Sequence, residues 1–424
     1  MAFETSRFGT APAAAELSEQ TAGLIPREDG SHRPAVAILG TRGIPAAHGG
    51  FETLAERLAL YLAGRGWRVT VYCQREVDTV RQRFATTMWR GVELVHVEVG
   101  LTGAAATLAF DGHCARHAAT RTVPCLVLGY NGAVFLPWLR LRGCKVLTNM
   151  DGIEWRRPKW GLAVRAYFFA SEWLAAWASH RLIADHPAIA DHLATRRPRG
   201  AIATIPYGGD PVAAAPTAPL EVLGLAPDGY LLSVARIEPD NSILAIVRAF
   251  SRRRRGARLV VLGCLDPANP YHRAVQAEAG DEVLFTGGIY DTAIVQALRF
   301  HARAYLHGHQ VGGTNPSLVE ALWAGNAVIA HANPFNAWTA GPEQILFRDE
   351  TELEAAIDLA LTQPERLAPA RAAARRRAVE RFQWSEVLAN YEAEIYVLAT
   401  GRHASPGPAS RPALNRPAAS PGAR

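Results

Sequence analysis

The sequence predicts an α/β protein with two Rossmann-like domains that face a central cleft. Short apolar runs, typical of buried parallel strands, alternate along the chain with amphipathic helical stretches. This alternation stops at a proline- and alanine-rich stretch, residues 211–219, and then restarts in a second half of similar size. The length of 424 residues agrees with two domains, because one domain typically has about 150 residues.

The first half begins with an apolar strand at 35–40, a glycine-rich loop and a helix that ends at Gly64. A second strand at 67–73 completes a β–α–β unit. The strand-to-helix corner of such a unit is where doubly wound sheets bind ligands. The remaining elements expected in this half are strands at 92–97, 126–128, 145–148 and 181–184, and a helix over 162–178.

The second half repeats this order up to about Thr400 and is helical and basic from Pro364 onward. Its expected elements are strands at 230–235, 258–263, 283–286, 304–307 and 327–330, and helices at 242–251, 292–301 and 317–324. Proline-rich composition at both ends predicts a disordered leader over 1–33 and a disordered tail over 401–424.

A net charge of +6 and a pI of about 9.2 favour anionic partners. Arginine runs at 252–255 and 375–377 supply part of this charge, and solvated helix faces are an equally simple explanation for them. No nucleic-acid-binding motif accompanies the charge, so we expect no nucleic-acid partner. Phosphate-bearing substrates and anionic membranes remain as the anionic partners to consider.

The five cysteines are widely spaced and include no CxxC pair. This spacing predicts neither a zinc site nor a disulfide framework, and it suits a reducing cytoplasm. We expect no signal peptide and no membrane-spanning helix, because the sequence has no basic-then-apolar leader and no uninterrupted apolar run of about 18 residues. A cytoplasmic, soluble or peripheral protein is therefore expected.

The sharpest local motif is HGHQVGGTNPSLVEALWAGNAVIA, residues 307–330. It predicts a strand, a glycine-rich loop and a helix that begins near Pro316 and Ser317. Backbone N–H groups and the helix dipole would then face an anion such as a phosphate. Glu320, one turn into the helix, could accept hydrogen bonds from ribose hydroxyls. The alternative is a tight turn whose glutamate merely suits the helix dipole.

Two further motifs suit an anionic ligand. Gly49 and Gly50 lie just before a helix and let the backbone approach a phosphate or a sugar, although no GxGxxG fingerprint is present. Arg236 follows a strand, at the carboxyl edge of the second sheet, where it could neutralise a diphosphate. The alternatives are a flexible turn at Gly49 and Gly50 and an exposed surface arginine at Arg236.

These motifs together resemble family 4 glycosyltransferases, which are retaining enzymes of the GT-B fold. The resemblance covers about residues 34–400 and rests on the joint order of GGFETLAERLALYLAGRGWRVTVY, TIPYGGD, SVARIEPDNSI, FTGGIYD and GGTNPSLVEALWAGNAVI. The wording of GTRGIPAAHGGFET, NMDGIEWRRPKW, ARIEPDN and HGHQVGGTNPSLVEAL is similar to the bacterial rhamnosyltransferase-like branch of capsule and exopolysaccharide biosynthesis.

The resemblance implies a nucleoside-diphosphate sugar as donor substrate, with no metal and no other cofactor. It implies Arg236 as the phosphate-binding arginine, and Asp151 and Asn315 join it as candidate catalytic residues. The donor-binding residues that it implies are Gly49, Gly50, Arg236, Asn241, Gly288, Ile289, Tyr290, Gly313, Thr314, Asn315, Pro316, Ser317 and Glu320. Two positions depart from the family pattern: Gly312 replaces a common glutamate, and Asn241 replaces a common lysine.

The resemblance also implies the domain organisation. An acceptor-side domain is expected at 34–207, a nucleotide-sugar domain at 208–380, and a helix at 381–400 that crosses back onto the first domain. The expected reaction moves rhamnose or another hexose to a saccharide acceptor carried by a lipid, in bacterial surface polysaccharide synthesis. A sugar-nucleotide epimerase and a catalytically silent sugar-nucleotide-binding scaffold are the alternatives.

A mixed basic and aromatic segment suggests contact with a membrane. Residues 155–160, WRRPKW, are followed by Arg165 and by the aromatic residues 167–169, ahead of an amphipathic helical stretch. This composition suits the surface of an anionic bilayer, such as the inner face of the plasma membrane. The alternative is an ordinary core-facing helix with exposed arginines.

Overall fold

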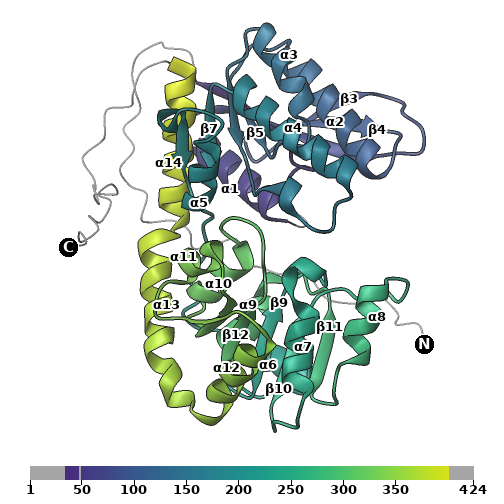
Figure 1. Ribbon diagram of the computed structural model, residues 1–424. Coiled ribbons are helices and arrows are strands. Elements are labelled where there is room, and N and C mark those ends of the chain that lie inside the picture. Colours follow the sequence, from purple (N-terminus) through teal and green to yellow (C-terminus); the bar gives the residue numbers. More distant parts are fainter. Residues whose placement is uncertain (1–33, 47–48, 401–424) are drawn as a thin grey trace, which may run out of the picture. The chain divides into compact units, whose positions relative to one another are not determined.

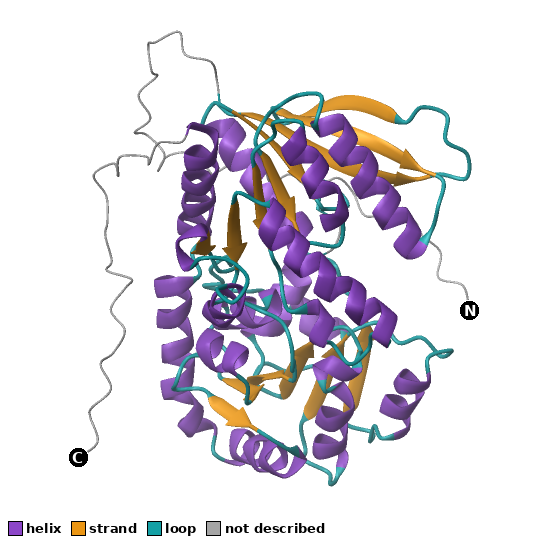
Figure 2. Ribbon diagram, turned by 45° about the horizontal axis from the view of Figure 1, so that its top comes forward, coloured by secondary structure: helices purple, strands orange, loops and turns teal. Residues whose placement is uncertain are grey.

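The computed structural model describes residues 34–46 and 49–400. The predicted disordered ends, 1–33 and 401–424, lie outside the described residues. Two β-sheets, each covered by helices, make up the described part of the chain (Figures 1 and 2). The predicted α/β fold with two Rossmann-like sheets is confirmed.

The first sheet has eight strands in the order β3-β4-β2-β1-β5-β6-β7-β8. All neighbouring strands run parallel except β3 and β4, which are antiparallel. The order reverses beside β1, since β2 lies on one side of it and β5 on the other. The strands are β1 (Ala35–Leu39), β2 (Arg68–Glu76), β3 (Phe84–Trp89), β4 (Val92–Val99), β5 (Cys125–Leu128), β6 (Val146–Asn149), β7 (Arg181–Ala184) and β8 (Ile202–Thr204).

The second sheet has six parallel strands in the order β11-β10-β9-β12-β13-β14. Here the order reverses beside β9, with β10 on one side and β12 on the other. The strands are β9 (Tyr230–Val234), β10 (Arg258–Leu262), β11 (Val283–Gly287), β12 (Ala304–His307), β13 (Val328–His331) and β14 (Ile345–Phe347).

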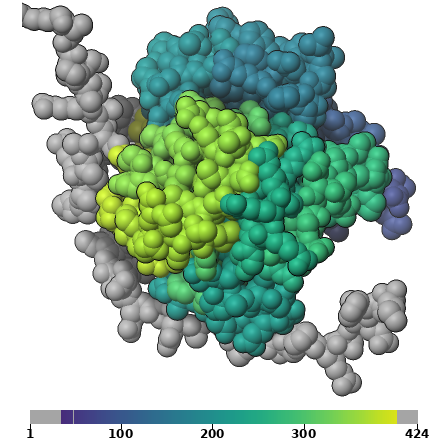
Figure 3. Space-filling view, turned by 60° about the horizontal axis from the view of Figure 1, so that its bottom comes forward, coloured from purple at the N-terminus to yellow at the C-terminus, as the bar shows by residue number. Residues whose placement is uncertain are grey.

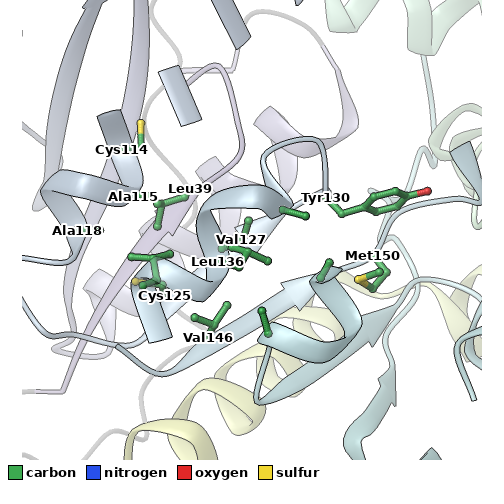
Figure 4. Close-up of a cluster of buried hydrophobic side chains, with 14 of the residues drawn as sticks. Leu39, Cys114, Ala115, Ala118, Cys125, Val127, Tyr130, Leu136, Val146 and Met150 are labelled. Atoms are coloured by element: carbon green, nitrogen blue, oxygen red, sulfur yellow. The ribbon is translucent and has the colours of Figure 1, made fainter. Parts of the chain in front are cut away.

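Helices cover both faces of each sheet, as the alternation of strand side chains requires. Along β1, Ala37 and Leu39 face one core, while Val36 and Ile38 face the other. The first of these cores lies under α2 (Gly103–Ala118), α3 (Leu136–Leu141), α4 (Leu162–Ala178) and α5 (Pro187–Leu193), and part of it is drawn in Figure 4. Leu39, Val127 and Leu136, labelled there, come from β1, β5 and α3.

The second sheet is packed in the same way. In β9, Leu231 belongs to one core, and Tyr230 and Leu232 belong to the other. Its helices are α6 (Ala218–Val222), α7 (Ile243–Ser251), α8 (Pro270–Ala277), α9 (Thr292–Phe300), α10 (Pro316–Trp323), α11 (Pro334–Ala340), α12 (Glu350–Thr362) and α13 (Ala368–Arg381). Figure 3 shows one face of these helices, with the yellow-green residues near the end of the chain beside green and teal ones.

Two helices cover the other face of the first sheet. They are α1 (Gly50–Gly64) and the C-terminal helix α14 (Trp384–Thr400), which run beside each other in Figure 1. Trp384, Tyr391 and Ile395 of α14 belong to the same buried cluster as Leu58 of α1. The last helix of the chain therefore completes the core of the first sheet.

Candidate functional site

The candidate site lies where the strand order of the second sheet reverses, between β9 and β12. In open parallel sheets, ligands bind outside the carboxyl ends of the strands at such a point. The loops that follow these two strands are tied together. Gln310 N–H donates to the Asp240 carbonyl over 2.8 Å, and its side-chain amide donates to Ser242 Oγ over 2.9 Å.

The glycine-rich turn after β12 leads directly into α10. Asn315 caps this helix, since its Oδ1 accepts from Ser317 N–H over 3.0 Å and from Ser317 Oγ over 2.8 Å. Pro316 occupies the first turn, where its missing N–H costs nothing. The predicted helix start is therefore found. The side-chain oxygen of Asn315 and the N–H of Ser317 are, however, already paired with each other.

Asp185 holds the turn from the end of β7. Its Oδ2 accepts from Thr314 N–H over 3.0 Å, and Thr314 Oγ1 donates to its backbone carbonyl. A side chain at Gly313 would meet this carboxylate, because a Cβ there would lie 2.0 Å from Asp185 Oδ1. The sequence gives no motif for Asp185. Its one signal is a polar residue directly after an apolar strand, the same signal that Asp151 has after β6.

The engagement of Thr314 N–H changes one expectation. The sequence predicts backbone N–H groups around Thr314 that face a phosphate, but a carboxylate accepts from this N–H in the structure. The Asp185 oxygen thus takes the contact that a phosphate oxygen would make. Burial raises the pKa of Asp185 well above its usual range, and the nearby Asp151 raises it further.

Glu320 lies on α10 and is paired with Arg299 of α9. The distance from Glu320 Oε2 to Arg299 Nη2 is 2.5 Å. The arginine is buried, whereas the glutamate side chain is 40% exposed. The carboxylate of Glu320, which we predict to contact the ribose, is therefore oriented by a buried cation and still reaches solvent.

Arg236 follows β9 with its side chain 71% exposed. Its Nη1 lies 3.2 Å from Glu238 Oε1, so one exposed ion pair holds it. Asn241 does not reach the same surface as this guanidinium. It is buried, and its Nδ2 donates to the backbone carbonyl of Arg236 over 2.8 Å. The side chain of Asn241 thus fixes the loop that carries Arg236, and its predicted donor contact stays a prediction.

Asp151 follows β6 of the first sheet and adopts a left-handed backbone conformation, with φ of 50°. Its N–H donates to Asn149 Oδ1 over 2.9 Å, and Asn149 Nδ2 donates to Tyr391 Oη of α14 over 2.6 Å. Burial raises the pKa of Asp151 to about 6, with a further rise from Glu154, while Arg157 and Arg236 lower it. The influence of Arg236 places these two predicted residues within electrostatic reach of each other.

Gly50 and Pro316, both predicted as donor-binding, also lie together. A Cβ on Gly50 would lie 3.1 Å from Pro316 Cγ and 3.6 Å from the ring of Tyr207. Gly49 has φ of 91°, a conformation that glycine tolerates best. The start of α1 therefore approaches the turn after β12 closely, and glycine at position 50 leaves room for it.

Gly288, Ile289 and Tyr290 follow β11, the edge strand of the second sheet. They are two strands away from β9 and so form a separate part of the same sheet edge. Tyr290 is 67% exposed, with its hydroxyl 4.0 Å from Cys264 Sγ. The contact of these residues with a nucleobase stays a prediction.

Two histidines near the site were not predicted from the sequence as site residues. His307 and His309 stack with ring centroids 4.2 Å apart. Burial lowers the pKa of His309 to about 3 and that of His307 well below its usual range, so both rings are neutral at physiological pH. Neutral imidazoles beside Arg236 add no second positive charge to the site.

No group of three or more His, Cys, Asp or Glu side chains that could hold a metal ion occurs in the described residues. In the same part of the chain, no helix is long and apolar enough to cross a membrane.

Two family models match the chain. Residues 33–210 match a domain of unknown function (DUF1972), and residues 223–377 match "Glycosyl transferases group 1". No curated protein sequence matches the chain.

Solved structures share the fold over most of the chain. A sucrose-phosphate synthase from Thermosynechococcus elongatus has a TM-score of 0.72 at 18% identity, over 87% of this chain and 100% of that one. An α,α-trehalose 6-phosphate synthase from Burkholderia multivorans has a TM-score of 0.70 at 15% identity, over 88% and 100%.

A glycosyltransferase from Rickettsia africae has a TM-score of 0.61 at 13% identity, over 88% of this chain and 100% of that one. Identities this low show the fold alone, and the family match adds the class of enzyme. Residues 223–377 match the group 1 glycosyl transferases, and the chain is a glycosyltransferase with the α/β GT-B fold.

Proposed function

We propose that the chain is a retaining, metal-independent glycosyltransferase that takes its sugar from a nucleoside-diphosphate sugar. The observation that carries this proposal is the place of Arg236 and the turn Gly312–Ser317. They follow the two adjacent strands at which the second sheet reverses its order. An exposed guanidinium and a helix N-terminus at that point suit a diphosphate.

Each of the neighbouring residues would contact a different part of the donor. Arg236 neutralises the diphosphate as it leaves, which is the step at which charge develops. Glu320, held by Arg299, accepts from ribose hydroxyls. Ile289 and Tyr290 lie beside the base, and Asp151 and Asn315 are candidates for the sugar.

Donor binding at the turn requires a change at Asp185. Its carboxylate accepts from Thr314 N–H, so a phosphate oxygen that uses this N–H must displace it. Both are anions, and the two would repel each other if Asp185 stayed ionised. The raised pKa of Asp185 lessens this conflict, because the protonated carboxyl carries no charge.

Turnover of donors tests the proposal. The purified chain is incubated with UDP-glucose, UDP-galactose, GDP-mannose and dTDP-rhamnose, with and without methyl glycosides as acceptors. We expect release of nucleoside diphosphate from at least one donor, and an anomeric configuration in the product, read by NMR, that matches the donor. An inverted product would contradict retention.

The same assay separates the alternatives. An epimerase would convert the sugar nucleotide without any acceptor. A silent scaffold would bind a sugar nucleotide without turning it over. Turnover of none of the donors, with binding of one of them, would therefore favour the scaffold.

We propose rhamnose or another hexose as the transferred sugar and a lipid-linked saccharide as the acceptor, in the synthesis of bacterial surface polysaccharide. The motif wording of residues 40–53 and 149–160 supports this branch of family 4. One structural neighbour, an Escherichia coli protein of 11% identity, is described as bound with UDP-2-fluoro glucose. That neighbour supports a nucleoside-diphosphate sugar as the class of donor.

A membrane-facing surface would bring the enzyme to such an acceptor. Helix α4 leaves Leu162, Phe169, Trp173 and Trp177 exposed, and the nearby α3 exposes Trp138 and Leu141. Arginines border these apolar side chains: Arg142 lies over Trp138, and Arg196 lies over Trp173 and Phe169. An apolar strip with a cationic border suits the interface of an anionic bilayer.

Co-sedimentation with liposomes tests this surface. We expect the chain to sediment with vesicles that contain 30% phosphatidylserine and to stay in solution with vesicles of phosphatidylcholine alone. The double change Trp173→Ala and Trp177→Ala should lower the bound fraction several-fold. The exposed Val222→Ala, on α6, serves as a matched control, and equal binding of all three proteins would exclude this surface.

A further inference from the structure

The loop between β6 and α4, residues 150–161, brings part of the first sheet to the candidate site of the second sheet. Gly152 lies against the turn after β12, since a Cβ on Gly152 would lie 3.4 Å from Gly312 Cα. Lys159 Nζ lies 3.2 Å from Oε2 of Glu238, in the loop after β9. The loop 150–161 therefore contacts both of the loops between which the second sheet reverses its strand order.

Arg157 of this loop places a guanidinium at the same point. Its Nη1 lies 3.9 Å from Oδ2 of Asp240, a buried residue in the loop after β9. The pKa of His309, after β12, is lowered by burial and then by the charges of Arg157 and Arg236. The two arginines are therefore within electrostatic reach of one imidazole, Arg157 from the first sheet and Arg236 from the second.

The guanidinium of Arg157 has N–H groups to spare for a ligand. Its Nε donates to Glu154 Oε1 over 2.6 Å, which is the one hydrogen bond that the side chain makes within the described residues. The 3.9 Å between Nη1 and Asp240 Oδ2 is too long for a hydrogen bond. Oδ2 of Asp240 is in turn buried without a hydrogen-bond partner in the described part of the chain. The two terminal nitrogens of Arg157 are thus attracted to a carboxylate without being bonded to it.

The charge of Arg236 is partly offset before any ligand binds. Its Nη1 pairs with one oxygen of Glu238 over 3.2 Å, and Lys159 pairs with the other oxygen of the same carboxylate. The side chain of Arg236 is also 71% exposed, whereas that of Arg157 is 16% exposed. Water and salt screen an exposed charge more than a buried one, so Arg157 attracts a nearby anion more strongly than its distance alone suggests.

An arginine is well suited to hold a diphosphate at this point. Its planar guanidinium carries five N–H donors and stays charged at every physiological pH. Two of these donors can bind two oxygens of a phosphate side by side. A donor with two linked phosphates presents more negative charge than the single exposed guanidinium of Arg236 neutralises.

We infer that Arg157 is a second cation of the donor site and that its terminal nitrogens donate to the oxygens of the donor's diphosphate. The inference rests on the proposed use of a nucleoside-diphosphate sugar. It adds that the diphosphate is held from both sheets, by Arg236 after β9 and by Arg157 after β6. The first sheet then contributes to donor affinity through a charged side chain.

Calorimetric titration with nucleoside diphosphates tests this contact. The full chain is titrated with UDP, GDP and dTDP, as the wild type and as Arg157→Gln. For each diphosphate that the wild type binds, the Kd should rise at least ~10-fold in Arg157→Gln, because a hydrogen bond to a charged group is typically worth that much. An unchanged Kd in the folded variant would overturn the inference.

Arg156→Gln is the matched control for the loss of one positive charge. Arg156 is the neighbouring residue, it is exposed, and its guanidinium lies over the ring of Trp155. The Kd of Arg156→Gln should equal that of the wild type. An equal rise in Kd for the two variants would mean that net charge alone governs binding, and it would overturn the contact with Arg157.

Glu154→Gln separates contact with the ligand from support of the loop. This change breaks the ion pair of Arg157 with Glu154 but keeps the guanidinium. If Arg157 served only to balance Glu154, the two substitutions would weaken binding equally. We expect Glu154→Gln not to raise the Kd, since it removes a negative charge near the diphosphate.

Arg157→Lys completes the set and keeps the test valid if Arg157→Gln does not fold. Lysine retains the charge without the planar fork, so its Kd should lie between those of the wild type and Arg157→Gln. Thermal unfolding checks the fold of each variant. A Kd of Arg157→Lys equal to that of the wild type would contradict donation by the terminal nitrogens.

Failure of this inference and failure of the proposed function are distinguishable. If the wild type binds a diphosphate and the folded Arg157 variants bind it equally well, the role of Arg157 falls and the proposed donor stands. If the wild type binds none of the three diphosphates, the proposed donor falls and the role of Arg157 falls with it.

Discussion

Burial raises the pKa of three aspartates, Asp111, Asp151 and Asp185. The pKa of Asp111 rises to about 7 and that of Asp151 to about 6, while that of Asp185 rises well above its usual range. Desolvation is the largest cause in all three cases, because a low-dielectric surrounding disfavours the charged carboxylate. Such groups are expected where a protein binds a ligand.

Asp111 predicts a pH dependence of stability. A carboxyl group whose folded-state pKa is raised binds its proton more tightly in the folded state, so stability falls as pH rises from about 4 to about 7. Asp111→Asn removes this loss. We expect the variant to melt at the same temperature as the wild type near pH 4 and several degrees higher at pH 8.

Differential scanning fluorimetry between pH 4 and 8 measures this difference. The control is Asp191→Asn, the same substitution at an exposed aspartate on α5. A melting difference for Asp111→Asn that is the same at pH 4 and pH 8 would show that burial does not perturb this group.

Arg236 predicts a loss of turnover without a loss of structure. Its side chain is largely exposed and makes one ion pair, so Arg236→Ala should leave the melting temperature nearly unchanged. Turnover of the donor should fall ~100-fold or more, because one group that stabilises the leaving charge is typically worth that much. The control is Arg254→Ala, with an 83% exposed side chain. Near-normal turnover in a folded Arg236 variant would remove this residue from the mechanism.

At the scale of elements, α14 is the helix that connects the end of the chain to the first sheet. Glu392 accepts from three groups at once: Tyr61 Oη over 3.1 Å, Arg65 Nε over 2.9 Å and Trp67 Nε1 over 3.0 Å. The preceding residue, Tyr391, contacts Asn149 and through it the backbone of Asp151. The helix therefore holds both a core and a candidate catalytic residue.

Glu392→Ala should destabilise the chain by roughly 1–3 kcal/mol, because three donors lose their acceptor and one of them is charged. Urea unfolding followed by circular dichroism measures the change. Glu386→Ala on the same helix is the comparison, since Glu386 is exposed. An equal effect of the two substitutions would mean that the docking of α14 rests on its apolar side chains alone.

A substitution at Tyr391 separates its role in positioning Asp151, through Asn149, from its role in packing. Tyr391→Phe keeps the buried ring and removes the hydroxyl that accepts from Asn149 Nδ2. We expect a small loss of stability, about 1 kcal/mol, and a larger relative loss in kcat than in KM for the donor, since Asp151 loses its support. A loss of stability in Tyr391→Phe with unchanged kcat and KM would show that Tyr391 has a structural role only.

At the scale of the whole molecule, each sheet reverses its strand order once. The second sheet places Arg236 and the turn 312–317 at its reversal, and the first sheet places a pocket lined in part by Asp111 at its own. Gly50 and Pro316 lie where the start of α1 approaches this turn.

Much of this organisation follows from the sequence. Buried parallel strands such as 181–184 and 304–307 are continuous apolar runs, and the structure has both with these bounds. Strand β3 was not predicted, because this antiparallel edge strand is largely exposed and carries no apolar run. The short strands β8 and β14, with three residues each, give too little pattern to detect.

The candidate site was harder to predict in detail. Local chemistry indicates that Asn315 and Pro316 begin a helix, and they do. Contacts between distant residues leave no such signal: Asp185 with Thr314, Arg299 with Glu320, and Asp111 with Gly132 are separated by 129, 21 and 21 positions. The hydrogen bond from the Asn241 amide to the Arg236 carbonyl likewise has no signal in the sequence.

The most direct test of the central claim is binding of a sugar nucleotide at Arg236. The melting temperature of the chain is measured with each of UDP-glucose, UDP-galactose, GDP-mannose and dTDP-rhamnose at 1 mM, for the wild type and for Arg236→Ala. A ligand at ~100 times its Kd stabilises the folded state by about 2.7 kcal/mol, so at least one donor should raise the melting temperature by several degrees in the wild type and much less in the variant. No rise with any donor, or the same rise in both proteins, would contradict it.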